Sequence, residues 1–314
     1  MNETLIDYSI IIPVYYNEGS LRKTFDILKK KVIDSNTDLS CEIIFIDDGS
    51  GDSSFNELYE LWQENRDLIK IIRFSRNFGQ PQAIMAGYRH AKGKCLINIS
   101  ADLQDPPELI NEMLHSHFRE KFEIVICTRE ARDESFFRRV TSQLFYIIMK
   151  KLSFPNMPGK GFDFVLLSDR VKKIILQAQE VNAFFQGQIL WTGFSIKFIP
   201  YIRRRREIGK SRWTFGKKIK YLIDGVLSYS YFPIRMMSII GGLTAFMGFG
   251  YALVIVISWF IADVPFKGWA PIMIAILILS GIQMLMIGIV GEYLWRTLDQ
   301  VRGRQCYIIE RILE

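Results

Sequence analysis

The sequence predicts an α/β domain with a mostly parallel sheet and helices on both of its faces, followed by two transmembrane helices. Short β-rich runs alternate with amphipathic helical stretches through the first 130 residues. Two long runs without a charged residue, 236–262 and 268–291, occupy the last quarter of the chain. Basic residues cluster on both sides of these runs and account for much of the net charge of +7.

Five strands and four helices are expected in the first part. Strands are predicted at 8–14, 42–47, 69–74, 95–100 and 123–127, and helices at 20–35, 53–65, 80–91 and 107–121. Parallel sheets built in this way bind ligands beyond the carboxyl ends of their strands, where the strand order switches. The chemistry is therefore expected at the strand ends.

The pattern loosens after residue 127. Helices are predicted at 136–152 and 165–179, separated by a Gly/Pro-rich loop at 155–164 that contains Asp163. The apolar stretch 184–191 fits a floor beneath a site or a core segment equally well. An edge strand is expected at 196–202.

Both uncharged runs exceed the roughly 20 residues that cross a bilayer. Basic residues precede the first run and follow the second, whereas the short loop between them carries one charge of each sign. The positive-inside rule then places both flanks in the cytoplasm and the loop outside. The basic cluster is expected to contact anionic lipid headgroups, and the adjoining spans argue against a nucleic-acid partner. A buried pair of soluble helices is the alternative.

The expected organisation has four parts. Residues 1–215 form a cytoplasmic domain, and 216–235 form an amphipathic helix in the membrane interface. Residues 236–296 form a two-helix hairpin, with spans at about 236–262 and 268–295, and 297–314 form a cytoplasmic tail. Glycines in both runs favour close helix contact, within the hairpin or between copies of the chain, so a homo-oligomer is an expected partner. The acidic N-terminus shows no signal-peptide pattern, and the four cysteines form no CxxC pair, which favours reduced thiols.

One short stretch, 98–107, joins an apolar strand to a helix through acidic and amide groups. Two carboxylates, Asp102 and Asp105, and the carboxamide of Gln104 supply oxygen atoms at close spacing, and Pro106 and Pro107 then start the predicted helix. Oxygen ligands suit Mg²⁺ or Mn²⁺, which complete their coordination with substrate phosphates and water. The alternative is an acidic turn that only caps the helix.

Adjacent carboxylates follow the second predicted strand. A turn explains Gly49 and a capping residue at Ser50 or Asp52, but it does not explain both Asp47 and Asp48. One of the two is expected to contact a nucleotide.

Five motifs together carry a family resemblance: 11–15 (IIPVY), 46–50 (IDDGS), 76–79 (RNFG), 86–87 (AG) and 101–107 (ADLQDPP). In this order the chain resembles the GT-A family 2 glycosyltransferases, specifically polyprenyl-phosphate glycosyltransferases of the dolichyl-phosphate mannose synthase and bactoprenol glucosyltransferase type. The resemblance covers residues 8 to about 215, and the hairpin extends it to nearly the whole chain.

The resemblance implies a role for each matching residue. Asp102 and Gln104 are the implied metal ligands, which leaves Asp105 as the expected cap of the next helix. The implied contacts to the base and ribose of a nucleotide sugar come from Pro13, Tyr15, Glu18 and either Asp47 or Asp48. The lipid phosphate is assigned to Arg129, Arg138 and Ser142. Two positions depart from the family: Ser100 stands where relatives often have a further acid, and Tyr16 stands where they commonly have Asn.

The implied reaction is an inverting transfer from a nucleotide-sugar donor, UDP-glucose, to undecaprenyl phosphate at the cytoplasmic face of the bacterial plasma membrane. A phosphate with a second pKa of about 6 is largely a dianion and barely needs a general base. Bringing two anionic substrates together is the harder task, and guanidinium groups do this well, which favours Arg129 and Arg138 over any candidate base. The alternative is that these arginines belong to a solvated helix face. Asp163 is either an orienting carboxylate, a base or a loop cap.

Three other functions are alternatives to this one. A processive polysaccharide synthase is disfavoured because 188–191 lacks the Arg of the Gln-x-x-Arg-Trp motif and two spans cannot enclose a polymer. A different sugar on the same lipid, such as an aminoarabinose derivative or mannose, is compatible with the sequence. A non-catalytic, membrane-tethered nucleotide-sugar binding protein is the non-enzyme alternative.

Overall fold

The protein divides into two compact units, which are described separately. The computed structural model describes residues 6–130, 146–147, 149–151, 153–159, 161–178, 184–204, 215–260 and 270–314. Unit 1 comprises Met1–Asp224 together with Gln305–Glu314, and unit 2 comprises Gly225–Arg304. The candidate site lies in unit 1.

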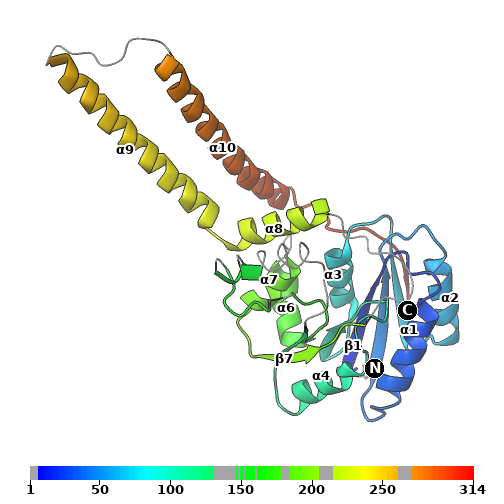
Figure 1. Cartoon of the computed structure of the whole chain (residues 1–314). Coiled ribbons are helices and arrows are strands. Elements are labelled where there is room, and N and C mark those ends of the chain that lie inside the picture. The colour runs from blue at the N-terminus through cyan, green and yellow to red at the C-terminus, as the bar shows by residue number, and fades with distance from the viewer. Residues whose placement is uncertain are drawn as a thin grey trace. The chain divides into compact units, whose positions relative to one another are not determined.

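The described part of unit 1 contains an eight-stranded sheet (Figure 1). Its strands are β1 (Tyr8–Val14), β2 (Cys41–Asp47), β3 (Ile69–Phe74), β4 (Cys95–Asn98), β5 (Ile124–Arg129), β6 (Val165–Ser168), β7 (Ile196–Tyr201) and β8 (Ile309–Leu313). They lie in the order β7-β5-β6-β4-β1-β2-β3-β8. β1 pairs in parallel with β2 and β4, β2 with β3, and β5 with β7, whereas β6 and β8 are antiparallel to their neighbours.

Helices cover both faces of this sheet. Residues of α1 (Leu21–Leu28), α2 (Ser54–Glu64) and α4 (Leu109–Phe118) pack in one apolar core, which also takes the side chains of Ile10 and Ile12. Residues of α3 (Gln80–His90), α6 (Asp169–Ala178) and α7 (Phe185–Trp191) pack in a second core with Ile11. Alternate residues of β1 thus enter opposite cores, which explains why this central strand is almost continuously apolar.

The predictions for the first 130 residues are confirmed closely. All five expected strands and all four expected helices are present; a short π-helical segment, Lys29–Ile33, continues α1, and α4 begins at Leu109, after the Pro-Pro pair. The edge strand at 196–202 is also confirmed as β7. The stretch 184–191 forms α7, whose first residues are buried in the core.

The helix predicted at 165–179 is wrong at its start. Val165–Ser168 is strand β6, paired with β4 and β5, and the helix begins only at Asp169. A short apolar run has no decisive period, so its pairing partners decide between strand and helix. Most of the predicted helix 136–152 lies outside the described residues.

Strand β8 was not predicted, because the local pattern of 297–314 indicates only a tail. It pairs antiparallel with β3. Lys70 on β3 lies 3.0 Å from the Glu314 carboxylate, and Phe74 stacks on Tyr307 at 5.0 Å between ring centroids. The strand therefore covers what would otherwise be an exposed sheet edge.

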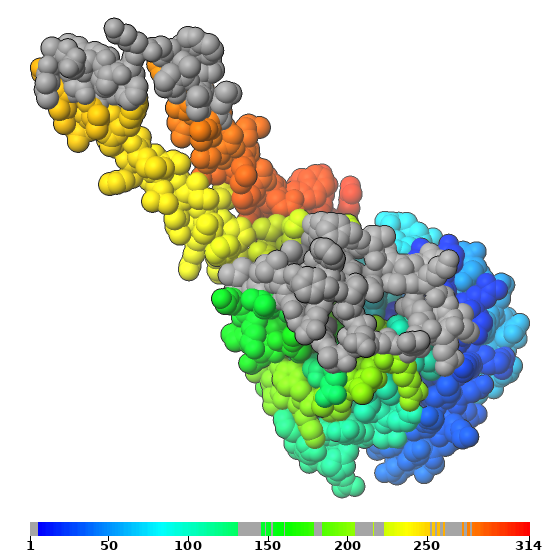
Figure 2. Space-filling view, in the orientation of Figure 1, coloured from blue at the N-terminus to red at the C-terminus, as the bar shows by residue number. Residues whose placement is uncertain are grey.

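Two long helices, α9 (Phe232–Phe260) and α10 (Ala270–Val301), make up most of unit 2. The stretches Phe232–Tyr251 and Ile278–Val301 are long and apolar enough to cross a membrane, and neither is buried. Phe246 and Phe249 are 79% and 81% exposed, and the surfaces of α9 (yellow) and α10 (orange) are visible in Figure 2. The preceding helix, α8 (Phe215–Tyr229), ends before Arg235, which belongs to α9.

Candidate active site

The candidate site lies along the edge of the sheet that is formed by the carboxyl ends of its parallel strands, at the point where the strand order switches. β1 lies between β2 and β4, so the chain leaves β1 toward one side and later returns to its other side at β4. The carboxyl ends of the parallel strands meet at this edge. Because β6 is antiparallel, its amino end lies there too: Val165 pairs with Asn98, and the Cys127 N–H donates to the Phe164 carbonyl at 3.0 Å. Sequence-distant polar residues are thereby brought together.

The loop after β4 forms a tight turn around Asp102. The Gln104 N–H donates to Asp102 Oδ1 at 3.1 Å, and the Ser100 hydroxyl lies 2.9 Å from the same oxygen. Leu103, between them, has a φ of 55°, which an L-residue adopts only where the surroundings hold it. The turn thus places the side chains of Asp102 and Gln104 on the same short loop.

These two residues fit a hard divalent cation. Within the described ranges no group of three or more His, Cys, Asp or Glu side chains could hold a metal. A cation here would therefore take Asp102 and the Gln104 Oε1 from the protein and its other ligands from phosphate and water, as Mg²⁺ and Mn²⁺ do at nucleotide sites. The Gln104 Nε2 donates to the Arg204 carbonyl at 3.3 Å, and Oε1 is the atom of this carboxamide whose chemistry suits a cation.

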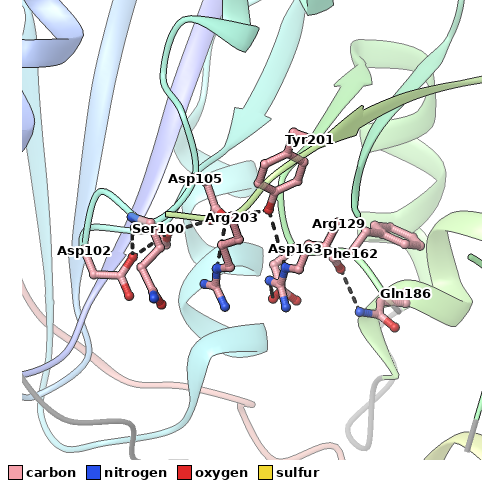
Figure 3. A network of polar contacts seen from close by, with 10 residues as sticks. Ser100, Asp102, Asp105, Arg129, Phe162, Asp163, Gln186, Tyr201 and Arg203 are labelled. Carbon is pink, nitrogen blue, oxygen red and sulfur yellow. Dashed lines mark hydrogen bonds and ion pairs between the residues drawn. The ribbon is translucent and has the colours of Figure 1, made fainter. Parts of the chain in front are cut away.

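Asp105 is not the helix cap that the sequence predicts. α4 begins at Leu109, with no side-chain hydrogen bond at its N-cap, and Asp105 is only 1% exposed. Its carboxylate accepts hydrogen bonds from the Tyr201 hydroxyl at 2.5 Å and the Ser100 hydroxyl at 2.6 Å, and Arg203 Nε lies 3.2 Å away (Figure 3). A buried carboxylate needs such donors, and only the folded chain supplies them.

Arg129, at the end of β5, forms an ion pair with Asp163. The Arg129 guanidinium donates to Asp163 Oδ2 at 2.7 Å and, through Nε, to the Tyr201 hydroxyl at 3.4 Å. Burial disfavours the cation, but Asp163 and Tyr201 outweigh it and raise the pKa of Arg129 above its ordinary value. A permanently charged guanidinium thus faces the site edge, in the arrangement that an orienting role for Asp163 requires. A role of Asp163 as a base stays a prediction.

The carboxylates of Asp47 and Asp48 are both buried. Asp47 Oδ1 accepts the Ser50 N–H at 3.0 Å, and Asp47 Oδ2 lies 3.6 Å from Arg73 Nε. Asp48 accepts the N–H groups of Phe78 and Gly79 at 2.7 and 2.9 Å, and burial nevertheless raises its pKa to about 6. Asp48 therefore holds the turn after β3 against the turn after β2. A nucleotide contact by either residue stays a prediction.

The chain after β1 is tied to the same turns. The Tyr16 N–H donates to the Ser50 hydroxyl at 3.1 Å, and Glu18 accepts the Ser53 N–H at 3.3 Å. Pro13 is paired with Ile46 in the sheet, and the ring of Tyr15 meets that of Tyr16 edge-to-face at 4.7 Å. Tyr16, the residue that departs from the family pattern, has a φ of 56° and is 38% exposed at this edge.

The structure brings together Asp102, Gln104, Arg129 and Asp163 with three residues that sequence reasoning missed: Tyr201, Arg203 and Gln186. Gln186 is 4% exposed and donates from Nε2 to the Phe162 carbonyl at 2.7 Å, beside Asp163 (Figure 3). Two signals were available: Tyr201 lies at the end of a predicted edge strand, and Gln186 lies in the apolar stretch 184–191, a candidate floor beneath a site. Two predicted phosphate contacts, Arg138 and Ser142, lie outside the described residues.

Comparison with known proteins identifies the family. The model of "Glycosyl transferase family 2" matches residues 9–176, more than half of the chain. The chain belongs to this family. It is therefore a glycosyltransferase, as the resemblance implied.

Relatives of this family match over nearly the full length. An uncharacterized glycosyltransferase of Synechocystis sp. is 34% identical, with 97% of this chain and 95% of the relative covered. The prophage bactoprenol glucosyl transferase homolog of Escherichia coli (strain K12) is 30% identical, with 97% and 98% covered. The glycosyltransferase is thus related to bactoprenol glucosyl transferases.

A solved structure supports the fold. The mannosyltransferase of Pyrobaculum calidifontis, in complex with GDP-Man and Mn²⁺, superposes with a TM-score of 0.50 at 14% identity. The match covers 70% of this chain and 63% of that chain. The described sheet and its helices have the mostly parallel GT-A architecture, followed by two long apolar helices.

Proposed function

We propose that this glycosyltransferase moves a sugar from UDP-glucose to the phosphate of undecaprenyl phosphate, with inversion, at the cytoplasmic face of the bacterial plasma membrane. The observation that carries the proposal is the meeting of two kinds of group at one sheet edge: the cation-binding oxygens of Asp102 and Gln104, and the guanidinium of Arg129. The bactoprenol acceptor named for the Escherichia coli relative supports a polyprenyl phosphate here.

On the donor side, Asp102 and Gln104 would hold Mg²⁺ or Mn²⁺, which would supply positive charge to offset the charge that develops on the leaving nucleotide diphosphate. The base and ribose lie against the turns after β1 and β2, which bring Pro13, Tyr15, Glu18 and the Asp47–Asp48 pair together. These turns are cross-linked by hydrogen bonds, so the pocket is held in shape before the donor arrives.

On the acceptor side, Arg129 with Arg138 and Ser142 binds the lipid phosphate. A guanidinium binds phosphate through two parallel N–H bonds and stays charged, which counters the repulsion between the two anionic substrates. Asp163 orients Arg129. A phosphate oxygen then attacks the anomeric carbon as the bond to the diphosphate oxygen breaks, and the leaving group takes the electron pair.

The chain after the catalytic domain brings it to the lipid. In this proposal 216–235 lies in the membrane interface, 236–296 forms a transmembrane hairpin, and the basic residues on both flanks contact anionic headgroups. The exposed apolar surfaces of α9 and α10 support this arrangement, because such surface is unfavourable in water. Glycines along both helices allow association with further copies.

The test is transfer of radiolabelled sugar by the full-length protein in membranes. UDP-glucose, GDP-mannose and an aminoarabinose donor would each be supplied with undecaprenyl phosphate and Mg²⁺ or Mn²⁺. Lipid-linked label with UDP-glucose supports the proposal, and label only with another donor reassigns the sugar. Nucleotide-sugar binding without transfer to undecaprenyl phosphate would contradict the proposed acceptor.

Two controls sharpen this test. Asp102→Ala should abolish transfer while leaving membrane insertion intact, whereas Asp67→Ala should keep full activity, because Asp67 is exposed just before β3, at the opposite edge of the sheet. The product should be β-linked when the donor is α-linked, as NMR of the anomeric proton reports. A retained configuration contradicts the single displacement.

A further inference from the structure

The last residue of β7 and the three residues after it, 201–204, are bound to the loop that carries Asp102 and Gln104. The Arg204 N–H donates to the Gln104 carbonyl at 2.9 Å, and the Gln104 side chain returns a bond to the Arg204 carbonyl at 3.3 Å. The Arg204 guanidinium also lies 3.2 Å from Glu108. These residues are about a hundred positions apart in sequence, so the contacts are made only when β7 joins the sheet.

Tyr201 is the centre of this contact. Its hydroxyl donates to Asp105 at 2.5 Å and accepts from Arg129 Nε at 3.4 Å. Its side chain is 6% exposed, and its ring meets the buried Phe164 ring edge-to-face at 6.2 Å between centroids. The hydroxyl is therefore held in place by packing from one side and by two charged groups from the other.

The polar contacts form one continuous chain, seen as a row in Figure 3. It runs from Asp102 through Ser100 to Asp105, and from Asp105 through Tyr201 to Arg129 and Asp163. Each end of the chain is a group to which the proposed function gives a substrate: the cation and donor diphosphate at Asp102, and the acceptor phosphate at Arg129.

We propose that Tyr201 is a positioning residue that couples the donor and acceptor halves of the site, by anchoring Asp105 and Arg129 to one hydroxyl. The inference rests on the proposed function. Ser100, which stands where relatives often have an acid, lies within hydrogen-bonding distance of both Asp105 and Asp102, and its one hydroxyl proton is shared between these two carboxylates. An enzyme that binds two anionic substrates must hold them at a fixed separation. The Tyr201 hydroxyl, as a shared hydrogen-bonding partner, does this without adding a charge to the site.

The matched variants are Tyr201→Phe and Tyr8→Phe. Each removes one buried phenol hydroxyl, but Tyr8 lies at the amino end of β1, on the opposite edge of the sheet. Arg203 remains beside Asp105 in the first variant, so the carboxylate keeps a counter-charge. Circular dichroism and thermal unfolding of the full-length protein in detergent check that both variants fold.

Two readouts separate coupling from a structural role. Mn²⁺ binding in the presence of UDP, followed by electron paramagnetic resonance, should be weakened about tenfold by Tyr201→Phe, as is usual for residues that orient metal ligands. The KM for undecaprenyl phosphate should also rise, although Tyr201 touches neither substrate. Tyr8→Phe should change neither quantity. An unchanged Mn²⁺ affinity, or an effect on one substrate alone, overturns the inference.

A double-mutant cycle with Ser100→Ala tests the route. Because Ser100 and Tyr201 act through the same carboxylate, the double variant should lose no more Mn²⁺ affinity than the weaker-binding single variant. If the double variant instead loses Mn²⁺ affinity by the product of the two single losses, the two residues act independently. That result contradicts a shared effect through Asp105.

Failure of the proposed function gives a different pattern from failure of the inference. If the wild-type protein binds no Mn²⁺–UDP, the metal role of Asp102 is wrong and the inference falls with it. If the wild type binds Mn²⁺–UDP and the Tyr201→Phe variant binds it equally well, only the coupling by Tyr201 is wrong.

Discussion

Gly49 allows two turns of the candidate site to meet, and replacing it with alanine should damage the site edge more than other glycine substitutions there. Its φ is +67°, and a Cβ at this position would lie 2.5 Å from the Arg76 carbonyl carbon, 2.7 Å from the Arg76 Cα and 2.8 Å from the Asn77 nitrogen. All three are backbone atoms, which cannot rotate away. The alanine substitution would therefore also strain the hydrogen bonds that the neighbouring Asp48 accepts from Phe78 and Gly79.

The expected loss has two components. A non-glycine residue in the left-handed region costs about 1–2 kcal/mol. Forcing a methyl group into a packed site adds about 1–3 kcal/mol. Gly49→Ala should thus lower the free energy of unfolding by roughly 3 kcal/mol, which for a domain of this size is a fall in Tm of about 6–12 °C.

Gly19→Ala is the matched control. Gly19 has a φ of +78° at the same edge, but a Cβ added there would have nothing within 4 Å of it. Its alanine variant should show only the backbone component, about 1–2 kcal/mol. Thermal unfolding of the full-length protein in detergent, followed by far-UV circular dichroism at one scan rate, compares the two. Equal falls in Tm would refute the reasoning, because the close backbone approach would then contribute nothing.

Three further predictions concern charge and the sheet edge. Arg129→Lys keeps the charge but loses the two-pronged phosphate contact, so the KM for undecaprenyl phosphate should rise about tenfold. Initial rates at varied acceptor concentration measure this change, and an unchanged KM contradicts the phosphate contact. Deleting 305–314 removes β8 from β3 and should lower Tm and increase amide hydrogen exchange in β3, with unchanged exchange contradicting the pairing. Burial raises the pKa of Asp48 to about 6 in the folded protein, so folding favours the protonated carboxyl. The contribution of Asp48 to the free energy of unfolding is therefore present below about pH 4 and is lost as the pH rises through about 6. Urea unfolding across that range should show the decline in wild type but not in Asp48→Asn.

Local pattern was sufficient for the elements that make up the centre of the sheet. Ile10, Ile11 and Ile12 are fully buried, and a continuous apolar run of this length between polar turns predicts a central parallel strand. The amphipathic helices and the two long apolar helices were predictable for the same reason: each is specified by the spacing of neighbouring residues. The strand ends then indicated the oxygen-rich stretch 98–107, and the family resemblance selected Asp102 and Gln104 within it as candidate ligands.

Long-range pairing decided the remainder. Val165–Ser168 became a strand because β4 and β5 present open edges on both of its sides, and Ile309–Leu313 became one because β3 does. Neither run is long enough to specify a strand by its own period. The local sequence around Asp105 likewise does not distinguish a helix cap from a buried carboxylate that accepts hydrogen bonds from other side chains.

The sequence alone was therefore enough to place an oxygen-rich turn at the end of a buried strand. The tertiary structure determined which residues surround that turn. Tyr201 and Asp105 lie 96 positions apart, and their hydroxyl and carboxylate meet only because β7 and β5 lie on the same side of β4 in the sheet. The strongly periodic elements follow from the spacing of neighbouring side chains, whereas the short strands β6 and β8 and a contact across 96 residues depend on the order in which the strands pair.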